Sequence, residues 1–337
     1  PNEENVVQIY SEGFPDLFKV SLHELDQNAK SIDPTTSLIR GVISIFKSRG
    51  KKIGGFNAYI TSDVLVGSGL SSSASIEVLL GKIISLLFNK DSVDSVELAI
   101  IGQEAENIFL GKPCGLMDQL ACAYGGIVAI DFENPSKPDI TALDYSFNNN
   151  GYQLLVIDTG GDHADLTDDY AAIPMEMKNV AEFFGEKNLR DLKREDFFRE
   201  IPELTRTLGD RAVLRALHFF NEDERVVFMV DHLQQNRIEK YLDTVQKSGD
   251  SSYKYLQNVF TSKHVSAQKI SLAIALTECF PDFKGAVRVH GGGFAGTIQV
   301  YLKLEVCKAY TDYMKHFFGP QSVTPLKIRE KGAVTIL

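Results

Sequence analysis

The chain has 337 residues, of which 44% are hydrophobic, so it can bury a substantial core in one large domain or two smaller ones. Its formal net charge is −10 and no cluster of Lys and Arg stands out, which argues against nucleic acid or an anionic membrane as a partner. No apolar run approaches the roughly 20 residues that span a bilayer. The four cysteines are scattered without a C-x-x-C pair, so we expect reduced thiols in a cytoplasmic protein.

The first part of the chain alternates short strands with helices. Residues 6–10 and 18–22 have the composition of two strands joined by a turn. Residues 37–48 place apolar side chains at helical spacing and stop before a glycine. A strand over 58–65 and a helix over 76–88 follow, and a segment rich in glycine and serine joins them.

That joining segment, residues 66–75, is the first candidate site. Its glycines let the backbone turn tightly, and the first turn of the following helix offers unpaired N–H groups to an anion. Its serine hydroxyls can reach phosphate oxygens or a magnesium ion. The alternative is a serine-capped helix, but this many glycines and serines exceed what a cap needs. The Walker pattern is absent, and the Rossmann pattern begins at Gly67 and Gly69 but fails at Ser72.

The middle of the chain carries a second candidate. A helix is expected over 93–110 and a short one over 117–124, with Asp118 in the first turn of the latter. A carboxylate there is favoured by the helix dipole, so a purely structural role for Asp118 is the alternative. A strand over 127–131 and a turn over 134–139 follow, and the polar segment 147–151 suggests a domain boundary.

The remaining chain is mostly helical, with strands at both ends. We expect a strand over 153–159 and, further along, strands over 297–302, 323–328 and 333–337. Helices are expected over 175–184, 194–201, 210–220, 225–247, 266–280 and 305–318. The acidic segment 162–169 does not have the spacing of an EF-hand, so no dedicated metal site is expected there. His218 has the pattern of a packed helix residue rather than a base.

A second glycine-rich stretch lies near the end. Gly291, Gly293 and Gly296 formally satisfy G-x-G-x-x-G, but a strand follows where a dinucleotide site requires a helix. The alternative for this stretch is a purely structural glycine-rich hairpin.

Three of these segments resemble the motifs of the GHMP small-molecule kinases, and of galactokinases in particular. Residues 67–75 resemble the phosphate motif G-G-G-L-S-S-S-A-S, with Ser68 in place of the middle glycine. Residues 104–107 and 113–119 resemble the stretch A-E…P-C-G-I-M-D-Q. Residues 291–296 resemble the motif G-G-G-F-G-G, with Ala295 as a departure.

The resemblance implies an α+β fold of two domains with the active site between them. Residues 1–150 would form the N-terminal GHMP kinase domain, a β/α domain whose sheet is truncated. Residues 151–337 would form the C-terminal domain, with a ferredoxin-like α+β fold. The expected activity is ATP-dependent phosphorylation of the C1 hydroxyl of galactose, with Mg²⁺ as cofactor and a monomer that binds no nucleic acid or membrane.

The resemblance also assigns roles residue by residue. Asp118 matches the catalytic aspartate, and Ser73 and Glu106 match the ligands of magnesium. The remaining assignments fall into three groups: phosphate-binding Gly67, Ser68, Gly69, Leu70, Ser71, Ser72 and Ser73; sugar-binding Gly115, Asp118 and Tyr170; and the supporting loop Gly291, Gly292 and Gly293.

One family motif is not found. Galactokinases carry G-R-x-N-L-I-G-E-H-T-D-Y near the N-terminus, which supplies an arginine and several sugar ligands, and the resemblance here begins at about Val6. We therefore expect the given polypeptide to be catalytically impaired by itself and to expose a sheet edge near residues 6–10.

Three alternatives stay open at this point. The chain could phosphorylate another substrate, such as N-acetylgalactosamine or mevalonate, although residues 113–119 favour a hexose. It could be a non-catalytic sensor of galactose and ATP, although the intact Ser73-Ala74 pair favours an enzyme. It could also be an inert relative, which only the absent motif supports.

Overall fold

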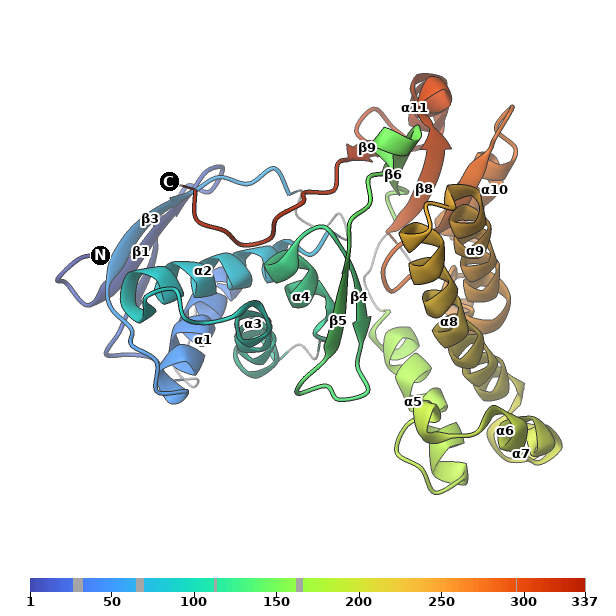
Figure 1. Ribbon diagram of the computed structural model, residues 1–337, viewed down its shortest axis with the longest axis horizontal. Helices are drawn as coiled ribbons and strands as arrows, with labels where there is room; N and C mark the ends of the chain where they lie inside the picture. The colour runs from blue at the N-terminus through green and yellow to red at the C-terminus, as the bar shows by residue number, and fades with distance from the viewer. Residues whose placement is uncertain (27–32, 65–69, 112–113, 162–165, 295, 337) are drawn as a thin grey trace. The chain divides into compact units, whose positions relative to one another are not determined.

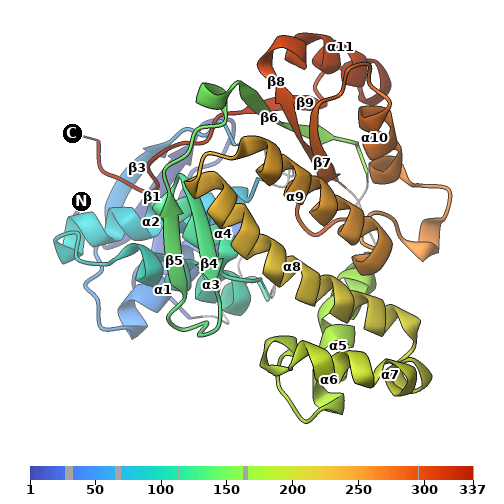
Figure 2. The same cartoon turned by 45° about the vertical axis from the view of Figure 1, so that its right-hand side comes forward.

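The computed structural model describes residues 1–26, 33–64, 70–111, 114–161, 166–294 and 296–336. The chain forms two compact units, Pro1–Ala142 with Ile328–Leu337, and Leu143–Lys327. Figure 1 shows the elements of both units, and Figure 2 shows them from a second side. This division differs from the expected 1–150 and 151–337, because the second unit begins earlier and the last residues return to the first unit.

In the part of the chain that the structure describes, the first unit combines two small sheets with four helices that pack on one another. Its sheets have the strand orders β2-β1-β3 and β4-β5. The elements, in chain order, are β1 Val6–Ser11, β2 Phe18–Ser21, α1 Pro34–Ser48, β3 Phe56–Ile60, α2 Ser72–Asn89, α3 Ser95–Phe109, α4 Met117–Tyr124, β4 Ile127–Asp131 and β5 Asp139–Leu143. Strand β5 was not predicted, since only a turn was expected before it.

The expected open edge at residues 6–10 is wrong. Strand β1 is paired on both sides, antiparallel with β2 and parallel with β3. The parallel pairing is possible because α1 carries the chain back across the sheet before β3 begins. The edges of this described sheet are therefore β2 and β3.

Helices α1 and α2 build the core of the first unit. Asp33 caps α1 by accepting a hydrogen bond from Thr36 N at 2.8 Å, and Pro34 occupies its first turn, as helix starts favour. Leu80 and Ile84 of α2 are buried in the same apolar cluster as α1. Among the described helices, α2 alone is long and apolar enough to cross a bilayer. Of its 18 residues, 39% are buried inside the protein. A core helix passes the same test.

The returning tail packs against the end of α4. Gly126 N donates to Arg329 O at 2.7 Å, and Gly332 N donates to Tyr124 O at 3.0 Å. A Cβ on Gly332 would lie 2.2 Å from Ala123 O, so only glycine allows this approach. The strand predicted over 333–337 is wrong for the described residues, because the tail bonds to the helix end rather than to a strand.

The second unit is built on one antiparallel sheet with the strand order β7-β8-β6-β9. Its strands are β6 Tyr152–Asp158, β7 Gly285–Val289, β8 Thr297–Lys303 and β9 Val323–Leu326. Its α-helices are α5 Thr167–Phe183, α6 Arg194–Arg199, α7 Ile201–Leu208, α8 Asp210–Gln234, α9 Ile238–Ser251, α10 Lys269–Glu278 and α11 Cys307–Phe318. Its short 3₁₀ helices are η1 Asn148–Asn150, η2 Leu189–Asp191, η4 Ser262–His264 and η5 Leu304–Val306, and η3 Ser252–Leu256 is a π-helical turn.

Strand order and connections match the ferredoxin-like β-α-β-β-α-β arrangement that the resemblance implied. Side chains alternate across the sheet with period two. Val300 and Leu302 of β8 are buried in a cluster with Tyr310 of α11, whereas Tyr301 contacts Tyr241 of α9. The α+β fold of the prediction is confirmed.

Several helix boundaries in the second unit differ from the prediction. The expected helix 225–247 is interrupted at residues 235–237, between α8 and α9. Helix α8 runs without a break through the polar residues 221–224, where two separate helices were expected. Asn221 accepts a hydrogen bond from Arg194 at 2.7 Å and Glu222 one from Arg225 at 2.7 Å, so charged partners stabilise this polar turn as helix. Helix α5 begins at Thr167, eight residues before the expected start at residue 175, and includes Pro174.

Candidate functional site

The start of α2 faces the acid that the sequence singled out. Ser71 Oγ donates a hydrogen bond to Asp118 Oδ2 over 2.6 Å. Asp118 is exposed in the first turn of α4, so its carboxylate is accessible to a ligand. Ser71 itself is left-handed, with φ +56°, a conformation that a non-glycine residue seldom adopts and that is common at functional turns.

The other predicted phosphate-binding residues divide into two sets. Leu70, Ser72 and Ser73 are partly buried at or just before the first turn of α2, where unpaired backbone N–H groups collect. Gly67, Ser68 and Gly69 lie outside the described residues.

Ser73 and Glu106 provide neighbouring oxygen atoms. Ser73 Oγ lies 3.4 Å from Glu106 Oε1, and Glu106 is only 3% exposed on α3. Hydroxyl and carboxylate oxygens are the ligands that Mg²⁺ prefers, and kinases usually complete its shell with substrate phosphates and water. No cluster of three or more His, Cys, Asp or Glu able to hold a metal occurs among the described residues. Ser73 and Glu106 therefore offer two neighbouring oxygen atoms of the kind that a divalent cation takes as ligands.

The loop before α4 is held by α3. Gln103 Nε2 donates to Cys114 O at 3.1 Å, and Cys114 N donates to Asn107 Oδ1 at 2.8 Å. Gly115 is exposed beyond these bonds, and a Cβ there would meet nothing within 4 Å. Burial, with the Glu106 carboxylate as hydrogen-bond partner and neighbouring charge, raises the pKa of Cys114 to about 12, so this thiol stays neutral at physiological pH.

In the second unit, Tyr170 is bonded to the glycine-rich loop. Its hydroxyl donates to Gly293 O at 2.8 Å, and its ring packs edge-on against Phe294. Burial raises the pKa of Tyr170, with the Asp169 carboxylate adding to the effect, so the phenol keeps its proton. A Cβ on Gly292 would lie 2.7 Å from the Tyr170 ring, which explains why a glycine stands there.

Asn258 holds the same loop from the other side. Its Nδ2 donates to Gly292 O at 3.1 Å, and its backbone oxygen accepts from Phe294 N. Asn258 is 4% exposed, and the sequence analysis had not identified it. No spacing signal links it to the loop, because the two are 34 residues apart and lie in different elements.

We expect Gly293→Ala to destabilise the second unit by about 2–4 kcal/mol. The new Cβ would lie 2.0 Å from Asn258 O, and the backbone has φ +85°. Gly291→Ala is the matched control, because Gly291 has φ +67° but open space around it, and should cost only about 1 kcal/mol. Urea unfolding of both variants measures this, and equal losses would contradict the clash.

The acidic segment and His218 have structural partners. Lys263 forms an ion pair with Asp168 at 3.0 Å, and Thr261 donates to Asp169 at 2.9 Å. His218 is 7% exposed, its Nδ1 lies 2.9 Å from Ser251 Oγ, and burial lowers its pKa, so it is a neutral packed residue. Asp162, His163 and Asp165 lie outside the described residues.

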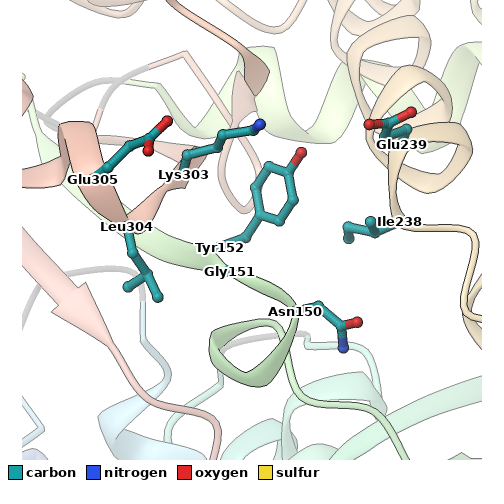
Figure 3. A pocket seen from close by; sticks show the side chains of 8 residues that line it. All are labelled: Asn150, Gly151, Tyr152, Ile238, Glu239, Lys303, Leu304 and Glu305. Carbon is teal, nitrogen blue, oxygen red and sulfur yellow. The ribbon is translucent and has the colours of Figure 1, made fainter.

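A cavity of about 470 Å³ opens elsewhere in the second unit. Figure 3 shows Lys303 and Tyr152 near its centre and Glu239 across from them. None of the site residues predicted from the sequence lines this cavity, so the cavity does not coincide with the site that the motifs indicate.

Comparison with known proteins gives concordant matches. The family model described as the GHMP kinases N terminal domain matches residues 37–126. A galactokinase of Glaesserella parasuis serovar 5 (strain SH0165) is 34% identical over 291 residues, which cover 84% of this chain and 72% of that protein. A galactokinase of Actinobacillus pleuropneumoniae is 30% identical over 289 residues, with coverage of 84% and 72%.

Solved structures agree at the level of the fold. Lactococcus lactis galactokinase complexed with galactose superposes with a TM-score of 0.81 at 22% identity, covering 98% of this chain and 84% of that one. A mevalonate kinase superposes with a TM-score of 0.60 at 15% identity, covering 98% and 87%.

Proposed function

Because this chain belongs to the galactokinase family of the GHMP kinases, we propose that it transfers the γ-phosphoryl group of ATP to the C1 hydroxyl of galactose. The proposal rests on two side-chain hydrogen bonds at the start of α2, between Ser71 and Asp118 and between Ser73 and Glu106. One acid is exposed and the other is buried, which suits an acceptor site beside a cation site.

The proposed phosphate site is the segment 67–73 with the start of α2. Backbone N–H groups and the positive end of the helix dipole would hold the phosphate oxygens, and the hydroxyls of Ser71, Ser72 and Ser73 would add further donors. Catalysis of phosphoryl transfer depends mainly on positioning the reactants and neutralising charge, and this arrangement supplies both.

Asp118 is the proposed partner of the acceptor hydroxyl. As the C1 oxygen bonds to the γ-phosphorus, the bond from that phosphorus to the bridging oxygen breaks and ADP leaves. The hydroxyl proton passes to the Asp118 carboxylate, or the carboxylate orients the hydroxyl electrostatically. Ser71 Oγ already donates to one carboxylate oxygen, which holds the acid in place for either role.

Ser73 and Glu106 are the proposed protein ligands of Mg²⁺. The cation would neutralise charge on the phosphates when bound. Glu106 is fixed by burial and Ser73 by its position in the first turn of α2, so both oxygens are preorganised.

Sugar contacts are proposed for Gly115, Asp118 and Tyr170, and Gly291, Gly292 and Gly293 are proposed as a supporting loop. Tyr170 uses its proton for Gly293 O, but its oxygen keeps lone pairs that can accept from a sugar hydroxyl. We further propose a cytoplasmic monomer whose partners are ATP and galactose, without nucleic acid or membrane.

Galactose-dependent ADP release, measured in a coupled assay, tests the proposal. The assay compares residues 1–337 with a form that carries any upstream coding sequence, and it includes N-acetylgalactosamine and mevalonate as competing acceptors. We expect galactose to give the highest kcat/KM. Preference for another acceptor would move the chain to a different GHMP kinase activity, and tight binding of galactose and ATP without turnover in either form would favour a regulator.

A further inference from the structure

A buried polar cluster lies directly behind the serines of α2. Glu77, Glu106 and Gln119 are 1%, 3% and 1% exposed, and they come from α2, α3 and α4 respectively. Burying two carboxylates close together is costly unless each is hydrogen-bonded. The amide that lies between them is therefore central to the cluster.

One nitrogen serves both carboxylates. Gln119 Nε2 donates to Glu77 Oε2 at 3.0 Å and to Glu106 Oε2 at 3.3 Å. A side-chain amide carries two N–H donors, so both bonds can form at once. The other oxygen of Glu106, Oε1, is the atom that lies 3.4 Å from Ser73 Oγ. Gln119 thus holds one oxygen of Glu106 while the second faces the serine.

The local sequence supports this arrangement on every helix. Glu77 follows Ser73 by one turn, so both lie on the same side of α2. Gly102 precedes Glu106 by one turn on α3, and a Cβ there would lie 3.0 Å from Glu77 Oε2 and 3.3 Å from Gln119 Cγ. On α4, Asp118 and Gln119 are adjacent, and they bond to Ser71 and to the buried carboxylates respectively.

We propose that Gln119 is a positioning residue, anchored on Glu77, that orients Glu106 to receive the Mg²⁺ of MgATP. This role rests on the proposed function. Partners that orient a metal ligand from behind typically change metal affinity by about 10- to 100-fold when they are removed.

The test is Gln119→Met, which keeps the length of the side chain and removes both donors. Binding of a non-hydrolysable ATP analogue is followed by the shift in thermal midpoint while Mg²⁺ is titrated. We expect the half-saturating Mg²⁺ concentration to rise about 10- to 100-fold, while binding of the analogue without Mg²⁺ and the KM for galactose stay unchanged.

Gln246→Met is the matched control. Gln246 Nε2 likewise donates to two carboxylates, Asp250 at 3.3 Å and Glu278 at 3.1 Å, but it lies in the second unit. This variant should lose some stability and keep the Mg²⁺ dependence of the wild type. A loss of Mg²⁺ affinity in both variants would assign the effect to general destabilisation and overturn the role of Gln119.

If the methionine variant does not fold, Gln119→Asn tests the positioning role instead. This variant keeps the amide but is one carbon too short to reach both carboxylates. A raised half-saturating Mg²⁺ concentration supports the proposal, and a wild-type value overturns it. Wild-type protein that binds the analogue without Mg²⁺ dependence would contradict the proposed function as well. Normal dependence in both the wild type and the Gln119 variants would contradict only the positioning role.

Discussion

Asp118→Asn is expected to lower the turnover of galactose by about 10²- to 10⁴-fold, the usual contribution of a positioned acid or base. The substitution removes the charge and the proton acceptor but keeps an oxygen that can accept the hydrogen bond from Ser71 Oγ. Asp118 is exposed, so the free energy of unfolding should change by no more than about 0.5 kcal/mol. Steady-state ADP release, in the form of the protein that is active, gives the comparison.

Asp210→Asn is the control variant for the loss of a negative charge at a helix N-terminus. Asp210 is exposed in the first turn of α8, as Asp118 is in the first turn of α4, so the two variants lose the same interaction with a helix N-terminus. The Asp210 variant should keep wild-type turnover. If the Asp118 variant retained more than about a tenth of the activity, the role of Asp118 as the acceptor's partner would be wrong.

Glu106→Gln is expected to raise the half-saturating Mg²⁺ concentration by more than about 100-fold, since loss of a direct ligand should exceed loss of its supporting partner. The variant is isosteric, but the amide cannot supply the charge that a divalent cation requires. Mg²⁺ dependence of ADP release at saturating galactose measures the effect.

Glu222→Gln controls for the loss of a hydrogen-bonded carboxylate. Glu222 accepts from Arg225 at 2.7 Å and from Ser248, within the second unit. Its replacement should reduce stability and leave the Mg²⁺ requirement unaltered. A Glu106 variant with the Mg²⁺ requirement of the wild type would show that the cation is held elsewhere.

Local sequence patterns predicted the elements around the site well. The short helix Met117–Tyr124 has the expected bounds, because its apolar spacing ends at two glycines. The helix after the glycine-serine segment was also expected, although it begins earlier, at Ser72. These elements depend on spacing and on breaker residues within a few positions, which a sequence displays directly.

Long-range hydrogen bonds could not be predicted in this way. Glu77 stands in an otherwise apolar stretch of α2, and its bond to Gln119 spans 42 residues. The bond from Tyr170 to Gly293 spans 123 residues. Such contacts depend on how whole elements pack, and periodicity carries no information about them. A glutamate among core positions of a helix is the one local signal that could have drawn attention to the cluster.

The failed predictions have a related cause. The polar residues 221–224 were expected to end a helix, but partners from α6 and from the helix itself stabilise them within α8. Residues 333–337 were expected to form a strand, but the described part of this tail bonds to the end of α4 instead. In both cases a tertiary contact outweighed the local propensity.

A crystal structure with galactose, Mg²⁺ and a non-hydrolysable ATP analogue would show where each substrate binds. We expect the nucleotide phosphates at the start of α2, the cation on Ser73 and Glu106, and the galactose C1 hydroxyl within hydrogen-bond distance of Asp118. Phosphates bound away from α2, or a sugar whose C1 hydroxyl contacts another residue while Asp118 faces solvent, would contradict this expectation.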